Sequence, residues 1–271
     1  MSRDESPVPP PEPLTVPAVD SHCHLDLLTI PVEEALAAAR LAGVTRVVTI
    51  GIDVPSSQWS ADTAAAHEGV VAAVALHPNE APESADLDAD LAAITELAKL
   101  PQVRAIGETG LDYYRTEEPG RPKQEESFRR HIALAKATGK ALVIHDRDAH
   151  ADVLRVLDDE GAPEHVVLHC FSGGADFARE CGERGFVLSF AGNVTFKSAG
   201  QLRDALGVTP LGRLLVETDA PFLTPVPHRG KHNAPNLIAV TLRAMAELKE
   251  VTVEELAESV SATATRVFGD W

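Results

Sequence analysis

The stretch "AVDSHCHLDLLTIPVEEALAAARLAGVTRVVTIGI", residues 18–52, contains two short apolar runs separated by a segment with helical periodicity. The runs are residues 18–24 and 46–52, and their β-branched side chains favour buried strands. Between them, Pro31 stands at a first-turn position of the expected helix, and Gly43 stands where that helix should stop. Strands that are buried on both faces and separated by a helix predict a parallel pair.

This alternation continues along the chain, which has eight such apolar runs in all. The other six are "VVAAVALH" (70–77), "VRAIGE" (103–108), "ALVIH" (141–145), "HVVLHC" (165–170), "GFVLSF" (185–190) and "RLLVETD" (213–219). Helical segments such as "EESFRRHIALAKATGK", residues 125–140, lie between them, and a final helix plus one more follow the last run. Eight repeats in about 250 residues favour a single-domain (β/α)8 TIM barrel, with an open doubly wound sheet as the alternative.

Composition limits the possible environments and partners of the protein. The 271 residues include 24 Lys+Arg and 41 Asp+Glu, a net charge of -17, so attraction to nucleic acid would need a local site or a bound cation. No apolar run reaches the roughly 18 residues that a membrane helix needs. Three cysteines without C-x-x-C spacing argue against a disulfide framework and a structural zinc knuckle.

The N-terminal segment "MSRDESPVPPPEPLTVP", residues 1–17, is rich in proline and lacks the apolar core of a secretory signal. We interpret it as a disordered or loosely attached leader that precedes one large domain, residues 18–271. The default location is then the cytoplasm, and nothing in the sequence indicates an obligate protein partner or a membrane.

Six of the eight runs end in side chains that can bind a metal or move protons. These side chains are His22, His24, His77, Glu108, His145, His169 and Asp219. In a parallel barrel all these ends lie on one face, and burying so many ionisable groups there is costly unless cations or mutual pairing offset it. His22 and His24 point the same way on a strand while Cys23 points the other way, which suits a metal with imidazole and carboxylate ligands. By contrast, His131 falls in a helical segment and is expected at the surface.

The strand-end residues lie inside five recognisable strings. In chain order they are "DSHCHLD" (20–26), "GETGLDYYR" (107–115), "LVIHDRDA" (142–149), "HCFSGG" (169–174) and "VETDAPFLTP" (216–225). From about residue 18 to the C-terminus, the chain thereby resembles the TatD-like metal-dependent deoxyribonucleases of the amidohydrolase-type barrel superfamily. The resemblance implies a (β/α)8 barrel that hydrolyses phosphodiester bonds in DNA, often from the 3′ end.

The resemblance also implies roles for individual residues. His22, His24 and Asp219 match the ligands of one divalent ion, His145 and His169 those of a second, and Glu108 the carboxylate that bridges the two. The identity of the divalent metal is left open among Mg, Mn and Zn. Glu108 and Asp219 are the expected catalytic residues, and Asp219 is the best candidate to accept the proton of the attacking water.

Candidates for substrate binding come from the loops beyond the strand ends. They are Arg229, Lys231, Arg147, His77 and Tyr113, with the three cations expected at phosphates. The string "RGKHN", residues 229–233, has His232 where a second arginine is common in the family, which bears on phosphate affinity and substrate choice.

Two other functions fit the same residues. One is a barrel hydrolase of a small amide, lactone or ester, in which the same activated water attacks a carbonyl carbon. The other is a metal-stabilised barrel that serves as a non-catalytic binding module.

Overall fold

The computed structural model describes residues 8–271 and contains one parallel sheet whose eight strands follow chain order. The strands are β1 (Ala18–Cys23), β2 (Val44–Ile50), β3 (Val70–Val74), β4 (Val103–Asp112), β5 (Ala141–Arg147), β6 (Val166–Leu168), β7 (Val187–Phe190) and β8 (Leu214–Val216). Each strand overlaps one of the eight predicted apolar runs. With helices between the strands, this is the predicted (β/α)8 barrel.

Helices separate the strands and also follow the last one. They are α1 (Val32–Leu41), α2 (Val54–Ala66), α3 (Leu87–Leu97), α4 (Arg121–Thr138), α5 (His150–Glu160), α6 (Ala175–Glu183), α7 (Gly200–Val208), α8 (Ile238–Lys249) and α9 (Val253–Phe268). Pro31 is the N-cap of α1, and the positive φ of Gly43, 86°, turns the chain after its end. Among the described residues, none of the helices has the length and apolar character needed to cross a bilayer.

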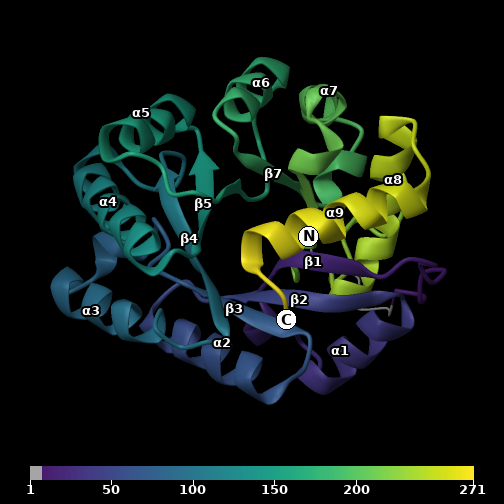
Figure 1. The fold of residues 1–271 in the computed structure, drawn as a ribbon, viewed down its shortest axis with the longest axis horizontal. Coiled ribbons are helices and arrows are strands. Elements are labelled where there is room, and N and C mark those ends of the chain that lie inside the picture. The colour runs from purple at the N-terminus through teal and green to yellow at the C-terminus, as the bar shows by residue number, and fades with distance from the viewer. Residues whose placement is uncertain (1–7) are drawn as a thin grey trace. The chain divides into compact units, whose positions relative to one another are not determined.

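The chain divides into two compact units, of which the first comprises residues 8–48 and Gly173–Arg266. In this unit β7 pairs with β8, with Phe190 opposite Val216. Beyond the strand ends, a parallel bridge joins Cys23 to Ala220. Helix α6 packs against α7, and α1 packs against the short 3-10 helix η6, Pro235–Leu237 (Figure 1).

The described part of the proline-rich leader, residues 8–17, has no helix or strand but is attached to the first unit. The Leu14 side chain is buried, and its N–H donates to the carbonyl of Ala42 at 3.0 Å. The carbonyl of Pro13 accepts from Arg243 at 3.1 Å, and that of Pro17 accepts from Ser261 at 2.9 Å. The boundary between leader and domain stays a prediction, and residues 1–7 lie outside the described part of the chain.

The second unit comprises Thr49–Ser172 and Val267–Trp271 and contains β3 to β6 in parallel pairs. Helix α2 packs on β3 and α4 packs on β4, so the blue and teal helices of Figure 1 cover these strands. The register places Gly110 opposite His145 and Ile144 opposite Leu168. His145 directly follows Ile144, and His169 directly follows Leu168. The pairing of Ile144 with Leu168 therefore brings the two histidines together.

The prediction that His131 lies at the surface is wrong, because its side chain is fully buried. The buried face of α4 includes Gln124, Phe128, His131 and Ala135, which follow the helical period and point towards the strands. The backbone N–H of Leu76 donates to Nε2 of His131 at 3.3 Å, and Nδ1 lies 2.9 Å from the hydroxyl of Thr109. These bonds satisfy a polar ring in an otherwise apolar interface.

Candidate metal centre

In the first unit, His22, His24 and Asp219 form a cluster at the ends of β1 and β8. Nε2 of His22 lies 3.8 Å and Nε2 of His24 lies 3.5 Å from Oδ1 of Asp219. Backbone bonds position them, since the N–H of Asp219 donates to the carbonyl of His22 at 2.9 Å and the N–H of His24 donates to that of Ala220 at 3.0 Å. The alternation expected of a strand is observed, because Cys23 between the two histidines is buried outside this cluster.

Asp20 joins β1 to the segment that carries Asp219. Its carboxyl accepts the hydroxyl of Thr218 at 2.5 Å and the backbone N–H of Thr218 at 2.9 Å. Burial raises the pKa of Asp20 to about 8, although these hydrogen bonds oppose the rise. Asp20 therefore holds the residue next to Asp219 in place and is not itself one of the clustered groups.

In the second unit, three histidines surround the carboxylate of Glu108. Its Oε1 atom lies 2.6 Å from Nε2 of His169, 2.8 Å from Nδ1 of His145 and 3.4 Å from Nε2 of His77. Glu108 is in β4, His145 is in β5, and His77 and His169 follow β3 and β6. Four consecutive strands of the sheet thus direct one side chain each to the same place.

The electrostatics of this second cluster centre on Glu108. Burial alone would raise the pKa of its carboxyl, but attraction to His169 and His77 and hydrogen bonds from His145 and His169 outweigh burial and hold the pKa well below its ordinary value. For His77, burial lowers the pKa of the ring despite the nearby carboxylate. Glu108 is therefore an anion at neutral pH, in a setting that also suits a cation.

The sequence interpretation missed Asp112, which holds the far side of the His145 ring. Oδ2 of Asp112 lies 3.1 Å from Nε2 of His145, while Nδ1 of that ring faces Glu108. Oδ1 accepts the backbone N–H groups of Tyr114 and Arg115 at 3.0 and 2.8 Å. A carboxylate that orients a ligating imidazole is a usual feature of metal sites, and the only sequence signal for it is its place inside "GETGLDYYR".

The two tyrosines after β4 have different surroundings. The hydroxyl of Tyr113 donates to Asp152 at 2.9 Å, and the guanidinium of Arg121 lies 4.1 Å from its ring centre. Burial, followed by the bond to Asp152, raises the pKa of Tyr113 to about 12. Tyr114 is exposed, at 66%, and the guanidinium of Arg147 lies 3.9 Å from its ring centre.

The two candidate cations after β8 lie on one loop of the first unit. The guanidinium of Arg229 lies 4.3 Å from the ring centre of Phe196, in a cation–π contact like that of Arg147. The backbone of Lys231 is fixed, because its N–H donates to the carbonyl of His228 and its own carbonyl accepts the hydroxyl of Thr224. In the same loop, Asn233 donates to the carbonyls of Thr218 and Phe222 and so connects the loop to the neighbourhood of Asp219.

Both clusters have the donor chemistry of a divalent-metal site. In the set of His22, His24 and Asp219, the ligand atoms lie within 4.8 Å of one another, and the same holds for His77, Glu108 and His145. Imidazole nitrogens mixed with carboxylate oxygens suit zinc, manganese or iron, and no thiol takes part in either set of described residues. Each unit thus has a three-residue donor set that fits a divalent cation.

Comparison with known proteins gives one family over nearly the whole chain. The family model described as TatD related DNase matches residues 19–269. The uncharacterized metal-dependent hydrolase TatD of Mycobacterium tuberculosis is 46% identical, over 93% of this chain and 97% of its own. The uncharacterized metal-dependent hydrolase YabD of Bacillus subtilis is 42% identical, over 92% and 98%. Among solved structures, the TatD homologue YjjV from Escherichia coli superposes with a TM-score of 0.88 at 26% identity, covering 94% of this chain and 98% of its own.

Proposed function

Because the chain belongs to the TatD-related DNase family, we propose that it hydrolyses phosphodiester bonds at the ends of single-stranded DNA and releases nucleotides from the 3′ end. It is a metal-dependent hydrolase of that family. The observation that supports the proposal most strongly is the arrangement of three histidines around Glu108, which lacks an evident purpose in a barrel without metal chemistry. A cytoplasmic location is part of the same prediction.

For the metal centre we assign His22, His24 and Asp219 to one divalent ion and His145 and His169 to a second, with Glu108 as the carboxylate between them. The barrel fold supports this assignment, because the carboxyl ends of its strands share one face. Magnesium, manganese and zinc all fit the assigned ligands. Divalent ions bound there would lower the pKa of water towards neutrality and offset the charge that develops on the phosphate.

The chain's own residues then orient the groups and move protons. Oδ1 of Asp219 faces His22 and His24, and we assign the Asp219 carboxylate as the group that accepts the proton of the attacking water. Asp112 orients His145 through Nε2, which keeps Nδ1 directed at Glu108. We assign His77, whose Nε2 lies 3.4 Å from Oε1 of Glu108, to contact with the substrate or with that carboxylate.

Substrate binding falls to the cations of the loops, because the chain as a whole repels DNA with its net charge of -17. Arg147 and Arg229 each lie against an aromatic ring, a contact that leaves the N–H edges of a guanidinium available to phosphate oxygens. Lys231 adds a point charge in the loop of Arg229. The exposed ring of Tyr114 offers a base a stacking surface, whereas Tyr113 supports the loop through Asp152.

The decisive test is cleavage of a short single strand labelled at either end, with added Mn²⁺ or Mg²⁺. We expect release of labelled mononucleotides from the 3′ end, and we expect EDTA to stop it. Glu108→Gln should lower kcat/KM by on the order of a thousandfold, since several kcal/mol of transition-state stabilisation depend on the metal centre. The matched control is Glu118→Gln, an exposed glutamate of the same unit.

Three results would contradict the proposal. DNA cleavage that persists in Glu108→Gln would show that the proposed metal centre takes no part in the reaction. Turnover of a panel of carboxyl esters, lactones and cyclic amides, with DNA left intact, would favour the small-molecule hydrolase instead. Inactivity on every substrate, together with stoichiometric metal binding, would favour the binding module.

A further inference from the structure

The ring of Phe222 lies beside the first metal cluster, on the segment that follows β8. Its centre is 6.2 Å from the centre of the His24 imidazole, and the two ring planes cross at 71°, so one ring meets the other edge-on. Phe222 is 42% exposed, although Ala220 and Pro221 before it are buried. A large apolar side chain is thus accessible to solvent while it contacts a proposed metal ligand.

The backbone on both sides of Phe222 is held in an unusual conformation. Asp219 and Leu223 have φ angles of 53° and 52°, in the left-handed region that residues other than glycine seldom adopt. The N–H of Phe222 donates to the carbonyl of Asp219 at 2.8 Å, and the carbonyl of Phe222 accepts from the side-chain amide of Asn233 at 2.6 Å. Such strain persists only where the surrounding structure fixes it, and it is concentrated at functional sites. The turn therefore fixes the point at which the Phe222 side chain leaves the backbone.

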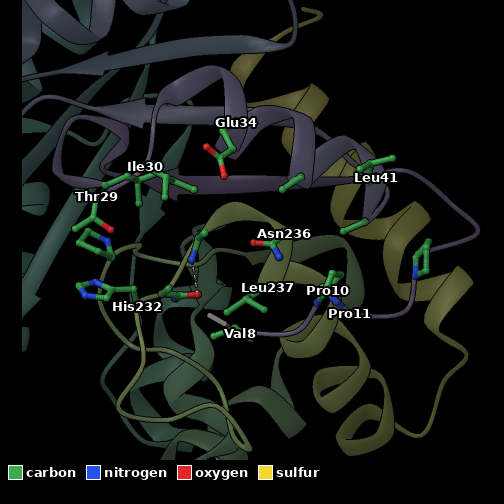
Figure 2. Close-up of a pocket in the computed structure, with 17 residues that line it drawn as sticks. Val8, Pro10, Pro11, Thr29, Ile30, Glu34, Leu41, His232, Asn236 and Leu237 are labelled. Atoms are coloured by element: carbon green, nitrogen blue, oxygen red, sulfur yellow. Dashed lines mark hydrogen bonds between the residues drawn. The ribbon is translucent and has the colours of Figure 1, made fainter. Parts of the chain in front are cut away.

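The cavity nearest in the fold does not take up the ring of Phe222. Pro221 and Asn233 line this cavity, which has a volume of ≈ 590 Å³ and lies between α1, the described part of the leader and η6 (Figure 2). Phe222 is not among the described residues that line it. Burial in this cavity therefore does not account for the position of Phe222, and the ring lies against His24 instead.

Two hydrogen bonds connect the segment of Phe222 to the loop that carries the candidate phosphate-binding cations Arg229 and Lys231. One is the bond from the amide of Asn233 to the carbonyl of Phe222. In the other, the hydroxyl of Thr224 donates to the carbonyl of Lys231 at 2.6 Å. The exposed ring and the loop of the two cations thus belong to one hydrogen-bonded assembly.

The chemistry of this assembly suits a ligand that is anionic at one end and flat and apolar at the other. A nucleotide has this form, because its base is one sugar away from its phosphate. A phenylalanine ring has no hydrogen-bonding group, but it offers a face on which any base can stack. We propose that Phe222 stacks on a base next to the bond that is cut, without selecting among the four bases. The inference rests on the proposed function in taking a DNA strand as the substrate.

The test is the binding of two single-stranded DNA probes to the full chain in Mn²⁺, followed by fluorescence anisotropy. Both probes carry a fluorophore at the 5′ end and phosphorothioates at the last linkages, which slow cleavage. In one of them the last two nucleotides lack their bases. The wild type should bind this abasic probe about ten- to a hundredfold more weakly than the intact probe. Phe222→Ala should bind the intact probe about tenfold more weakly than the wild type does, but the abasic probe equally well, because no base is left to stack.

Two further variants control for effects on structure. Phe222→Tyr keeps a flat ring and should bind both probes as the wild type does. Leu248→Ala removes a comparably exposed apolar side chain of the same unit, 39% exposed on α8, and should change neither affinity.

Equal weakening of both probes by Phe222→Ala, or no effect on either, would overturn the inference. Because binding is measured without cleavage, the two failures can be told apart. Cleavage of DNA by a protein that binds the two probes equally well would refute only the role of Phe222. A wild type that binds neither probe and cleaves no DNA would refute the proposed function together with this inference.

Discussion

Asp112 shows how a single carboxylate decides which nitrogen of a histidine is available. Its Oδ2 atom lies 3.1 Å from Nε2 of His145 and accepts a hydrogen bond from it, while Nδ1 donates to Glu108. If Nδ1 gives up its proton to bind a cation, the proton that is left on the neutral ring stays on Nε2. Nδ1 is the nitrogen that faces Glu108. The Asp112 side chain is fully buried and accepts hydrogen bonds from two backbone N–H groups, so it has little freedom to move away from the His145 ring.

We predict that Asp112→Asn lowers the affinity for a divalent ion by roughly 10- to 100-fold, because the amide no longer holds the imidazole in one tautomer. Calorimetric titration of metal-free protein with Mn²⁺ or Zn²⁺ measures this directly. Asp88→Asn, whose side chain is 85% exposed in the same unit, serves as the control. Unchanged metal affinity in Asp112→Asn would mean that the contact only supports the loop.

The buried ring of His131 leads to a prediction about how the stability of the protein depends on pH. Burial lowers the pKa of its ring from 6.5 to about 3, so the folded protein keeps it neutral where the unfolded chain protonates it. Its contribution to stability is complete above about pH 6.5 and is lost as the pH falls towards 3, by about 1.4 kcal/mol per unit. Urea unfolding of wild type and His131→Gln between pH 4 and 7 should show a shallower slope in the variant; parallel slopes would refute the assignment.

At the scale of elements, the close approach of β4 and β5 depends on glycine. Gly110 has a φ of 130°, and a Cβ atom built there would lie 2.1 Å from the carbonyl oxygen of His145. Gly107, just before Glu108, is similarly close to Val143. These contacts let β4 carry Glu108 and Asp112 directly beside the histidine of β5.

We predict that Gly110→Ala destabilises the protein by at least about 3 kcal/mol, because the methyl group strains the backbone and pushes His145 away. Chemical denaturation measures the loss, and metal titration of the folded fraction should show weaker binding. Gly182→Ala is the matched control: it lies in α6 with open space around it, and alanine there should stabilise by up to about 1 kcal/mol. Equal stability of Gly110→Ala and wild type would show that β4 and β5 tolerate a wider separation.

For the molecule as a whole, metal binding and folding should be linked. Each compact unit contains a cluster of groups that could hold a metal ion, built from residues far apart in sequence, so the proposed ligand sets exist only in the folded chain. A cation that binds only the folded protein stabilises it by about 2.7 kcal/mol at a concentration one hundred times its Kd.

We therefore expect EDTA to lower the Tm by roughly 5–10 °C relative to protein in excess Mn²⁺. Differential scanning calorimetry checks this, and His24→Asn should reduce the shift because Asp219 loses one neighbouring ligand. A Tm that is the same with and without metal would argue against the proposed ligands.

The sequence alone determined the alternation of eight strands with helices, because the period of apolar residues is a local property that each strand and helix carries in its own segment. It favoured the barrel over an open doubly wound sheet because eight such repeats fit in about 250 residues. It also indicated His22, His24, Glu108, His145, His169 and Asp219 as one group, since parallel strands bring their carboxyl ends to one face; their assignment to metals stays a prediction.

What only the tertiary structure decided is how side chains meet across elements. The contact of Asp112 with His145, the burial of His131, and the different surroundings of Tyr113 and Tyr114 depend on loop paths and on partners distant in sequence. The attachment of the leader also depends on the tertiary structure. The sequence predicts that this segment is loosely attached, but it is hydrogen-bonded to α8 and to the end of α1. Periodicity describes which face of an element is apolar, whereas the partner of a polar group is set by packing between elements.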